Sequence, residues 1–204
     1  HPIPRRQRQM CIRDSLGDEG RIPPSITGVG AKLTETALHK TLRGEGAIRH
    51  YMTTRMPDFG EAHAKFLVQH LTTADARADV KATPRDGKEN EVGRNQYGRE
   101  LMGIKGLNCI TCHQLGGNKS LGIQAMDLAS LPKRLRPEWF RDYLINPSNF
   151  RPGTRMPSFW PDGKAVSPIL GRNTERQIDS IWVYLNEFEP VSYTHLRAHE
   201  TPCH

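Results

Sequence analysis

The sequence predicts an all-α protein that contains two related helical modules, of which the first is incomplete. Apolar residues recur with helical spacing in several segments, and no segment shows the alternation of apolar and polar residues that is typical of a half-buried strand. A short pattern also occurs twice, since residues 54–57 and residues 154–157 both read TRMP and are followed by Phe59 and Phe159. Such a recurrence indicates a repeated structural unit.

The similarity between the two copies extends upstream of the repeated methionine. The first copy has Leu33, Leu38 and Leu42 where the second has Leu135, Phe140 and Leu144, and the front half of the module has no counterpart in the first copy. We therefore expect a partial module over residues 16–72, a polar linker over 73–91 and a complete module over 92–190.

The two ends of the chain, residues 1–15 and 191–204, resemble translated sequencing-adapter read-through, and we expect them to be artefactual tails. Such segments are set aside before the fold is considered. Cys11 and Cys203 then carry no biological meaning, which leaves two cysteines. The formal net charge is +7, of which four Arg and one Asp in residues 1–15 supply three charges, so +4 remains. This mild excess does not indicate a nucleic-acid partner.

The first two helices of the second module are expected over residues 92–107 and 136–144. The first places Tyr97, Leu101, Met102 and Ile104 on one apolar face, and its glycines could allow another helix to approach closely. In the second helix, Pro137 suits the first turn and Asn146-Pro147 suits a stop.

The last helix of each module carries an apolar stripe. In the second module Thr174 can cap this helix, whose stripe consists of Ile178, Ile181, Trp182 and Leu185. In the first module the corresponding helix is expected over residues 61–71, with Phe66, Leu67 and Leu71 on its buried side. Residues 28–30, which read GVG, are expected to form a loop, because they lack the rest of a nucleotide-binding fingerprint.

The most informative motif is Cys109-Ile110-Thr111-Cys112-His113. Two cysteines three residues apart with a histidine directly after the second form the attachment signature of c-type haem. Each thiol can add to a porphyrin vinyl group while His113 ligates the iron. Dithiol redox chemistry and a zinc site remain less favoured alternatives, because no β-branched run precedes Cys109 and no second cysteine pair lies outside the chain ends.

Met156 is the candidate for the second axial ligand. Its thioether is a soft ligand that raises the reduction potential of a haem iron, and Pro157 stiffens the loop and favours an extended conformation at Met156. The alternative is that Met156 only packs in the core.

Residues 92–188 resemble a class I cytochrome c domain, in which a first helix, CxxCH, a middle helix, a methionine loop and a last helix follow one another. The resemblance implies thioether bonds at Cys109 and Cys112, with His113 and Met156 as iron ligands. Residues 136–164 further resemble cytochrome c modules of multidomain proteins from environmental bacteria such as planctomycetes. Arg155 could pair with a haem propionate or remain solvated.

The first module resembles the rear half of another such domain. It has no CxxCH, so either the motif lay upstream and was lost, or this copy binds no haem; the intact TRMP favours loss, with Met56 left as a ligand for a second haem. His39, His50, His63 and His70 are assigned no ligand role.

The resemblance predicts a carrier of single electrons whose partners are redox proteins, and no enzymatic activity is assigned to the chain itself. The alternative is part of a dihaem, peroxidase-like enzyme or a haem sensor. Covalent haem attachment implies the periplasm or an extracytoplasmic membrane face, with a membrane tether allowed outside this fragment. No run of residues has the apolar length of a membrane span.

Overall fold

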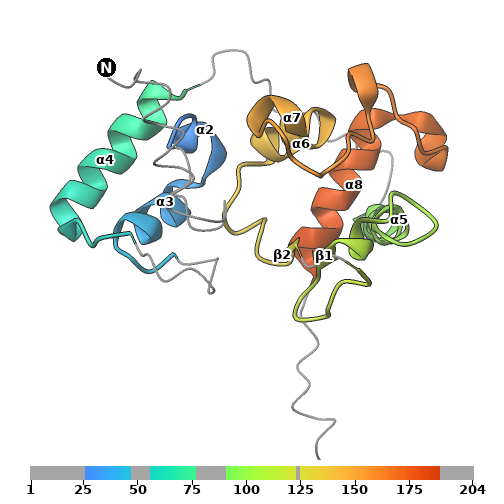
Figure 1. The fold of residues 1–204 in the computed structure, drawn as a ribbon, viewed down its shortest axis with the longest axis horizontal. Helices are drawn as coiled ribbons and strands as arrows, with labels where there is room; N and C mark the ends of the chain where they lie inside the picture. Colours follow the sequence, from blue (N-terminus) through green and yellow to red (C-terminus); the bar gives the residue numbers. More distant parts are fainter. Residues whose placement is uncertain (1–25, 47–55, 77–90, 123–124, 189–204) are drawn as a thin grey trace, which may run out of the picture. The chain divides into compact units, whose positions relative to one another are not determined.

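The structure is a computed structural model that describes residues 26–46, 56–76, 91–122 and 125–188 (Figure 1). The chain divides into two compact units, residues 1–77 and 78–204. Taken together, the described residues are mostly helical and contain few strand residues. The division falls inside the segment 73–91 that was expected to be a linker, and the expected artefactual tails lie outside the described residues.

The described part of the first unit contains three helices, α2 (Val29–Lys32), α3 (Glu35–Leu42) and α4 (Gly60–Ala74). Thr34 caps α3, because its Oγ1 accepts a hydrogen bond of 3.3 Å from the backbone N–H of Ala37. The prediction of a loop at residues 28–30 is wrong in part, since the single turn of α2 begins at Val29. Gly30 lets this turn approach α4 closely: a Cβ added there would lie 2.2 Å from the carbonyl oxygen of Leu71.

Helix α4 is longer than the expected 61–71, and its buried side agrees only in part with the expected one. Leu67 and Leu71 are half-buried. Ala64 is fully buried, whereas Phe66, expected on the buried side, is 58% exposed. The reason is that α2 and α3 contact only one side of α4. Phe66 lies off that side and stacks on His70, with 3.8 Å between the ring centroids.

The second unit is organised by the packing of α5 (Glu91–Met102) against α8 (Thr174–Glu187). Leu101 and Met102 are buried as expected, but Tyr97 is 37% and Ile104 is 68% exposed. Ile104 falls outside the apolar face because α5 ends at Met102, before the expected limit of residue 107. Gly98 provides the close approach expected of a glycine, since an added Cβ would lie 2.1 Å from the carbonyl oxygen of Ser180 in α8.

Short elements connect these two helices. In chain order they are η2 (Cys109–Thr111), β1 (His113–Gln114), β2 (Ala125–Asp127), α6 (Pro137–Ile145), α7 (Pro147–Phe150), η3 (Pro161–Gly163) and η4 (Ile169–Arg172). β1 and β2 pair in parallel, although the sequence showed no strand pattern. Strands of two and three residues are too short to show an alternation of apolar and polar residues.

The helix ends follow the sequence closely, with one correction. Pro137 stands in the first turn of α6 and Asn146 follows its last residue, as expected. The cap of α8 is Asn173 and not Thr174, because Asn173 Oδ1 accepts from the backbone N–H of Arg176 at 3.0 Å. Thr174 instead donates its hydroxyl hydrogen to the carbonyl oxygen of Gly163.

The two copies of the repeat bury equivalent residues. Leu33, Leu38 and Leu42 are 6%, 3% and 5% exposed, and their counterparts Leu135, Phe140 and Leu144 are 5%, 5% and 8% exposed.

A polar contact between helices is also shared by the two copies. His39 Nε2 in α3 lies 3.2 Å from Glu61 Oε2 near the start of α4. Its counterpart Arg141 in α6 pairs with Glu175 at the start of α8. Each unit thus has a basic side chain of its middle helix beside a glutamate near the start of its last helix.

No helix within the described ranges combines the length and the apolar character that crossing a membrane requires.

Candidate haem-attachment site

Cys109, Cys112 and His113 lie together directly after α5. Asn108 adopts a left-handed conformation with φ 58°, and this turn leads the chain from the end of α5 into the 3-10 turn of η2. The backbone N–H of Cys112 donates to the carbonyl oxygen of Cys109 at 3.2 Å, which holds the two thiols on one turn. Cys109 is partly buried, Cys112 is exposed, and both are free cysteines.

The two thiols have different surroundings. Burial raises the pKa of the Cys109 thiol to about 11, because the thiolate loses hydration. Cys109 is therefore a neutral thiol at physiological pH and behaves as an apolar group.

The imidazole of His113 is held by a backbone carbonyl. Its Nδ1 lies 3.0 Å from the carbonyl oxygen of Met126. A carbonyl oxygen can only accept a hydrogen bond, so Nδ1 carries the hydrogen and the lone pair of the neutral ring is on Nε2. Histidines that bind metal commonly donate their second ring N–H in this manner.

A short segment, here called the strap (residues 121–122 and 125–129), runs beside the motif. Four of its backbone N–H groups donate to motif or adjacent carbonyl oxygens at 2.7–3.1 Å: Leu121 to Ile110, Gly122 to Thr111, Ala125 to Cys112 and Leu128 to Gln114. The strap therefore fixes the backbone of the motif along most of its length.

Asp127 in the strap joins it to the turn that follows β1. Its Oδ1 accepts from the backbone N–H groups of Gly116 at 3.0 Å and Ala129 at 2.8 Å, and its Oδ2 accepts from Gly117 at 3.0 Å. Partial burial raises the pKa of Asp127, but the three hydrogen bonds outweigh it, so the pKa lies below its ordinary value. The carboxylate is therefore ionised at neutral pH.

Met156 is half-buried in the loop between α7 and η3, far from the motif in sequence but in the same unit. Its backbone N–H donates to Thr154 Oγ1 at 3.3 Å. Pro157 and Arg155 beside it are exposed. The role of Met156 as an axial ligand stays a prediction.

Arg134 is a cation near the start of α6 to which the sequence assigned no role in the site. Burial of its guanidinium lowers its pKa, because the charged form loses hydration. No side-chain hydrogen bond or ion pair joins it to another described residue. The burial of this cation is not visible in the sequence, and we assign it no role in the site.

The remaining candidate residues belong to the first unit. Met56 is 40% exposed. His39 pairs with Glu61, His63 is exposed, and His70 stacks on Phe66. His50 lies outside the described residues. Across the described residues of both units, no three His, Cys, Asp or Glu side chains cluster as a metal site.

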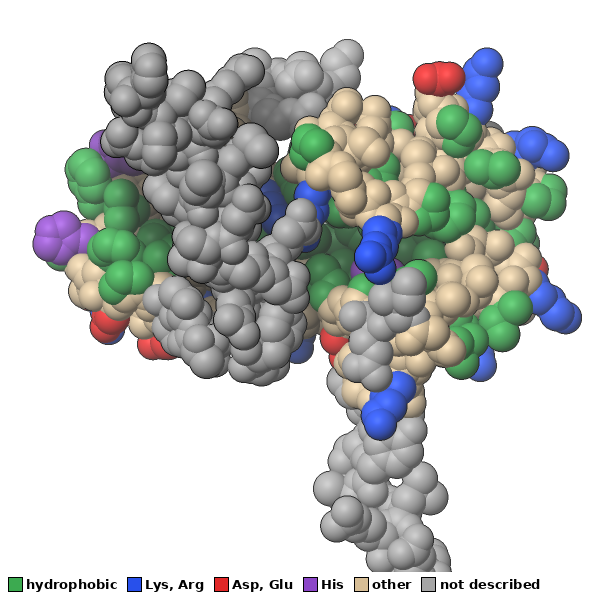
Figure 2. All heavy atoms as spheres, in the orientation of Figure 1, with side chains coloured by type: hydrophobic (Ala, Val, Ile, Leu, Met, Phe, Trp, Pro, Cys, Tyr) green, Lys and Arg blue, Asp and Glu red, His purple; other side chains and the backbone are tan. Residues whose placement is uncertain are grey.

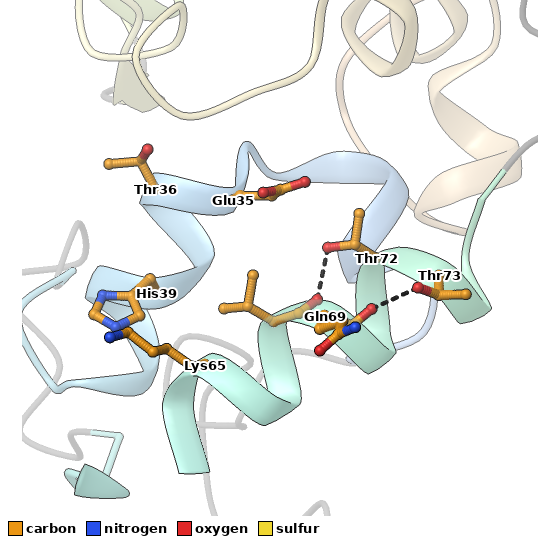
Figure 3. A pocket seen from close by; sticks show the side chains of 8 residues that line it. Glu35, Thr36, His39, Lys65, Gln69, Thr72 and Thr73 are labelled. Carbon is orange, nitrogen blue, oxygen red and sulfur yellow. Dashed lines mark hydrogen bonds between the residues drawn. The ribbon is translucent and has the colours of Figure 1, made fainter. Parts of the chain in front are cut away.

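An open groove of about 500 Å³ lies between α3 and α4 (Figure 3). His39 and Lys65 lie near one end, and Thr72 and Thr73 lie near the other. Both threonine hydroxyls donate to carbonyl oxygens of their own helix, at 2.7 and 2.8 Å. The groove thus offers few free polar groups, and we assign no function to it.

The surface shows no concentration of positive charge on the face in Figure 2, where described Lys and Arg side chains are scattered among polar and apolar ones. This agrees with the mild charge excess in the sequence.

No protein-family model, curated protein or solved structure matches this chain.

Proposed function

We propose that the second unit is a c-type cytochrome domain that holds one haem covalently at Cys109 and Cys112 and transfers single electrons. The observation that carries the proposal is the hydrogen bond from His113 Nδ1 to the carbonyl oxygen of Met126. It places the lone pair on Nε2 of the histidine that directly follows the cysteine pair, which is the nitrogen that an iron ligand must offer.

The residues present fit this cofactor. Both thiols are free, one in partly apolar surroundings and one at the surface, so both remain available for thioether bonds. The strap holds the motif by its backbone and leaves the side chains of Cys109 and Cys112 out of the hydrogen bonding. A haem at this position supplies an iron that alternates between the ferric and ferrous states.

Each residue then has a defined task. Cys109 and Cys112 would anchor the porphyrin, and His113 Nε2 and the thioether of Met156 would ligate the iron.

A haem iron held by both His113 and Met156 would have no open position for substrate, so the domain would pass electrons between redox proteins. Attachment of the haem places the domain in the periplasm or on an extracytoplasmic face of the membrane. The first unit, whose core positions repeat those of the second, would then be a related module, and Met56 would serve a second haem in an intact protein.

The test is production of the full chain together with a haem-maturation system. We expect covalent haem that survives denaturation and a stable sulfur-to-iron charge-transfer band in the oxidised protein. Met156→Ala should abolish this band and lower the reduction potential, because the soft ligand that favours ferrous iron is lost.

Met126→Leu is the matched control. Met126 is adjacent to the histidine in space, but it contributes its backbone carbonyl, and its side chain is 42% exposed. The band should therefore persist in this variant. A protein without covalent haem, or a high-spin spectrum that responds to peroxide, would contradict the carrier proposal.

A further inference from the structure

The carbonyl oxygen that holds His113 belongs to an irregular position in the strand pair. His113 pairs with Ala125 and Gln114 pairs with Asp127, so β1 advances by one residue while β2 advances by two. Met126 is the additional residue, and its carbonyl oxygen accepts from the imidazole. Bulges of this type redirect groups next to functional sites.

A bulge in so short a pair needs support, because strands of two and three residues supply little pairing to hold it. The backbone bonds beside it include those from Ala125 N to Cys112 O, at 2.7 Å, and from Leu128 N to Gln114 O, at 2.9 Å. A slip of one residue in either direction would carry the Met126 carbonyl away from Nδ1.

Asp127 directly follows the bulge and holds both sides of it. Its carboxylate accepts from Gly116 and Gly117, which follow β1, and from Ala129, which follows β2. These charge-assisted bonds are stronger than neutral ones. They join the two chain segments immediately beyond the bulge, where a slip would have to begin.

We propose that Asp127 is the positioning residue for His113: by fixing the bulge, it keeps the Met126 carbonyl on Nδ1 and so keeps Nε2 free for the iron. This inference rests on the proposed haem function. Asp127 does not touch the imidazole and acts through the backbone of Met126.

The test compares two substitutions in the haem-loaded full chain. Asp127→Glu keeps the charge but moves the carboxylate by one methylene, so it cannot reach the same three N–H groups. Asp127→Asn keeps the shape and one acceptor oxygen but removes the charge. Asp162→Asn, in the exposed turn of η3, is the control carboxylate.

The first readout is exchange of the His113 Nδ1 hydrogen with solvent, followed by NMR of ¹⁵N-histidine protein in the ferrous state. We expect about tenfold faster exchange in Asp127→Glu and Asp127→Asn and unchanged exchange in the control, because a hydrogen bond contributes about 0.5–1.5 kcal/mol and 1.4 kcal/mol corresponds to a factor of about ten.

The second readout is the reduction potential. A weaker Nδ1–H bond makes the imidazole a poorer donor, so ferric iron is less stabilised and the potential rises. A tenfold change in the ferric-to-ferrous ratio corresponds to about 59 mV for one electron. A rise in Asp127→Asn alone, with unchanged Nδ1 exchange in both variants, would show an effect of charge only and overturn the proposal.

The experiment still tests Asp127 if one variant fails to fold or if the chain binds no haem. If Asp127→Glu accumulates no folded protein, the milder Asp127→Asn decides through the Nδ1 exchange. If the wild-type chain takes up no haem, the haem function fails, but Asp127 can still be tested in the metal-free chain through the ¹⁵N shifts of His113. The positioning role would be refuted by a wild type that is not protonated on Nδ1. It would also be refuted by variants with the same tautomer as the wild type.

Discussion

Replacement of Gly98 by alanine should destabilise the second unit, because this glycine is where α5 and α8 approach each other most closely. The added Cβ would lie 2.1 Å from Ser180 O, 2.6 Å from Tyr184 Cβ and 2.8 Å from Ser180 C. Two of these atoms belong to the backbone of α8, so no side-chain rotation can relieve the clash. The helices must separate by about 1 Å before the closest contact exceeds 3.0 Å.

The size of the effect follows from this displacement. A gap of 0.5–1 Å already loses about a quarter to a half of the dispersion energy across an interface, and overpacked cores lose typically 1–3 kcal/mol. Alanine returns about 1 kcal/mol in helix propensity. Both helices carry buried residues, among them Leu101 in α5 and Ile181 in α8, which are 0% and 4% exposed. We therefore take the overpacking cost near its upper limit of about 3 kcal/mol, and subtracting the gain in propensity leaves a net loss of about 2 kcal/mol. For a unit of this size, that loss lowers Tm by roughly 8–16 °C.

The assay is thermal unfolding followed by tryptophan fluorescence in the full chain. All three tryptophans, Trp139, Trp160 and Trp182, belong to the second unit, so the signal reports this unit alone. Gly103→Ala is the matched control, since its Cβ would meet no atom closer than 3.3 Å. A Gly98→Ala protein that unfolds at or above the wild-type temperature would refute the close approach of α5 and α8.

Three further predictions concern single contacts. Gln177→Leu should lower the free energy of unfolding, measured by urea titration, by about 3 kcal/mol. The reason is that buried Gln177 accepts from Trp160 Nε1 at 3.0 Å and also donates to two backbone carbonyls. An unchanged free energy of unfolding would contradict this prediction. A double-mutant cycle on Arg141 and Glu175 should give a coupling of about 0.5–1 kcal/mol, since the pair is partly exposed, and a coupling of zero would show that the pair is not formed in solution. In haem-free protein at pH 8, alkylation of Cys109 should be about 100-fold slower in the native state than in urea, because burial raises its pKa from 9.0 to about 11 and a higher pKa leaves less thiolate. The native rate should rise as pH approaches 11, and equal native and denatured rates would refute the burial.

The helical class and the repeat could be predicted from sequence because both are local patterns. The spacing of apolar residues indicated α6 and α8 to within one or two residues, and the matched leucines of the two copies are buried alike. Errors arose where neighbours decided the outcome. Phe66 has the spacing of a core residue, but α2 and α3 cover only one side of α4 and leave it exposed.

The strap could not be predicted for a different reason. Its strand β2 has three residues and the partner strand β1 has two, and their pairing is irregular, so neither a period nor a register is visible in the sequence. Asp127 likewise carries no signal, because an aspartate that accepts three backbone N–H groups is identified by their positions and not by its neighbours in sequence.

The sequence by itself determined that two thiols and an imidazole lie close together, because they fall within five consecutive residues between predicted helices. Only the tertiary structure decided which nitrogen of His113 is free. That choice depends on the carbonyl of Met126, thirteen residues away, which reaches Nδ1 through a bulge between two short strands. Every residue has a carbonyl, so only the packing of the chain selects the one that orients the histidine.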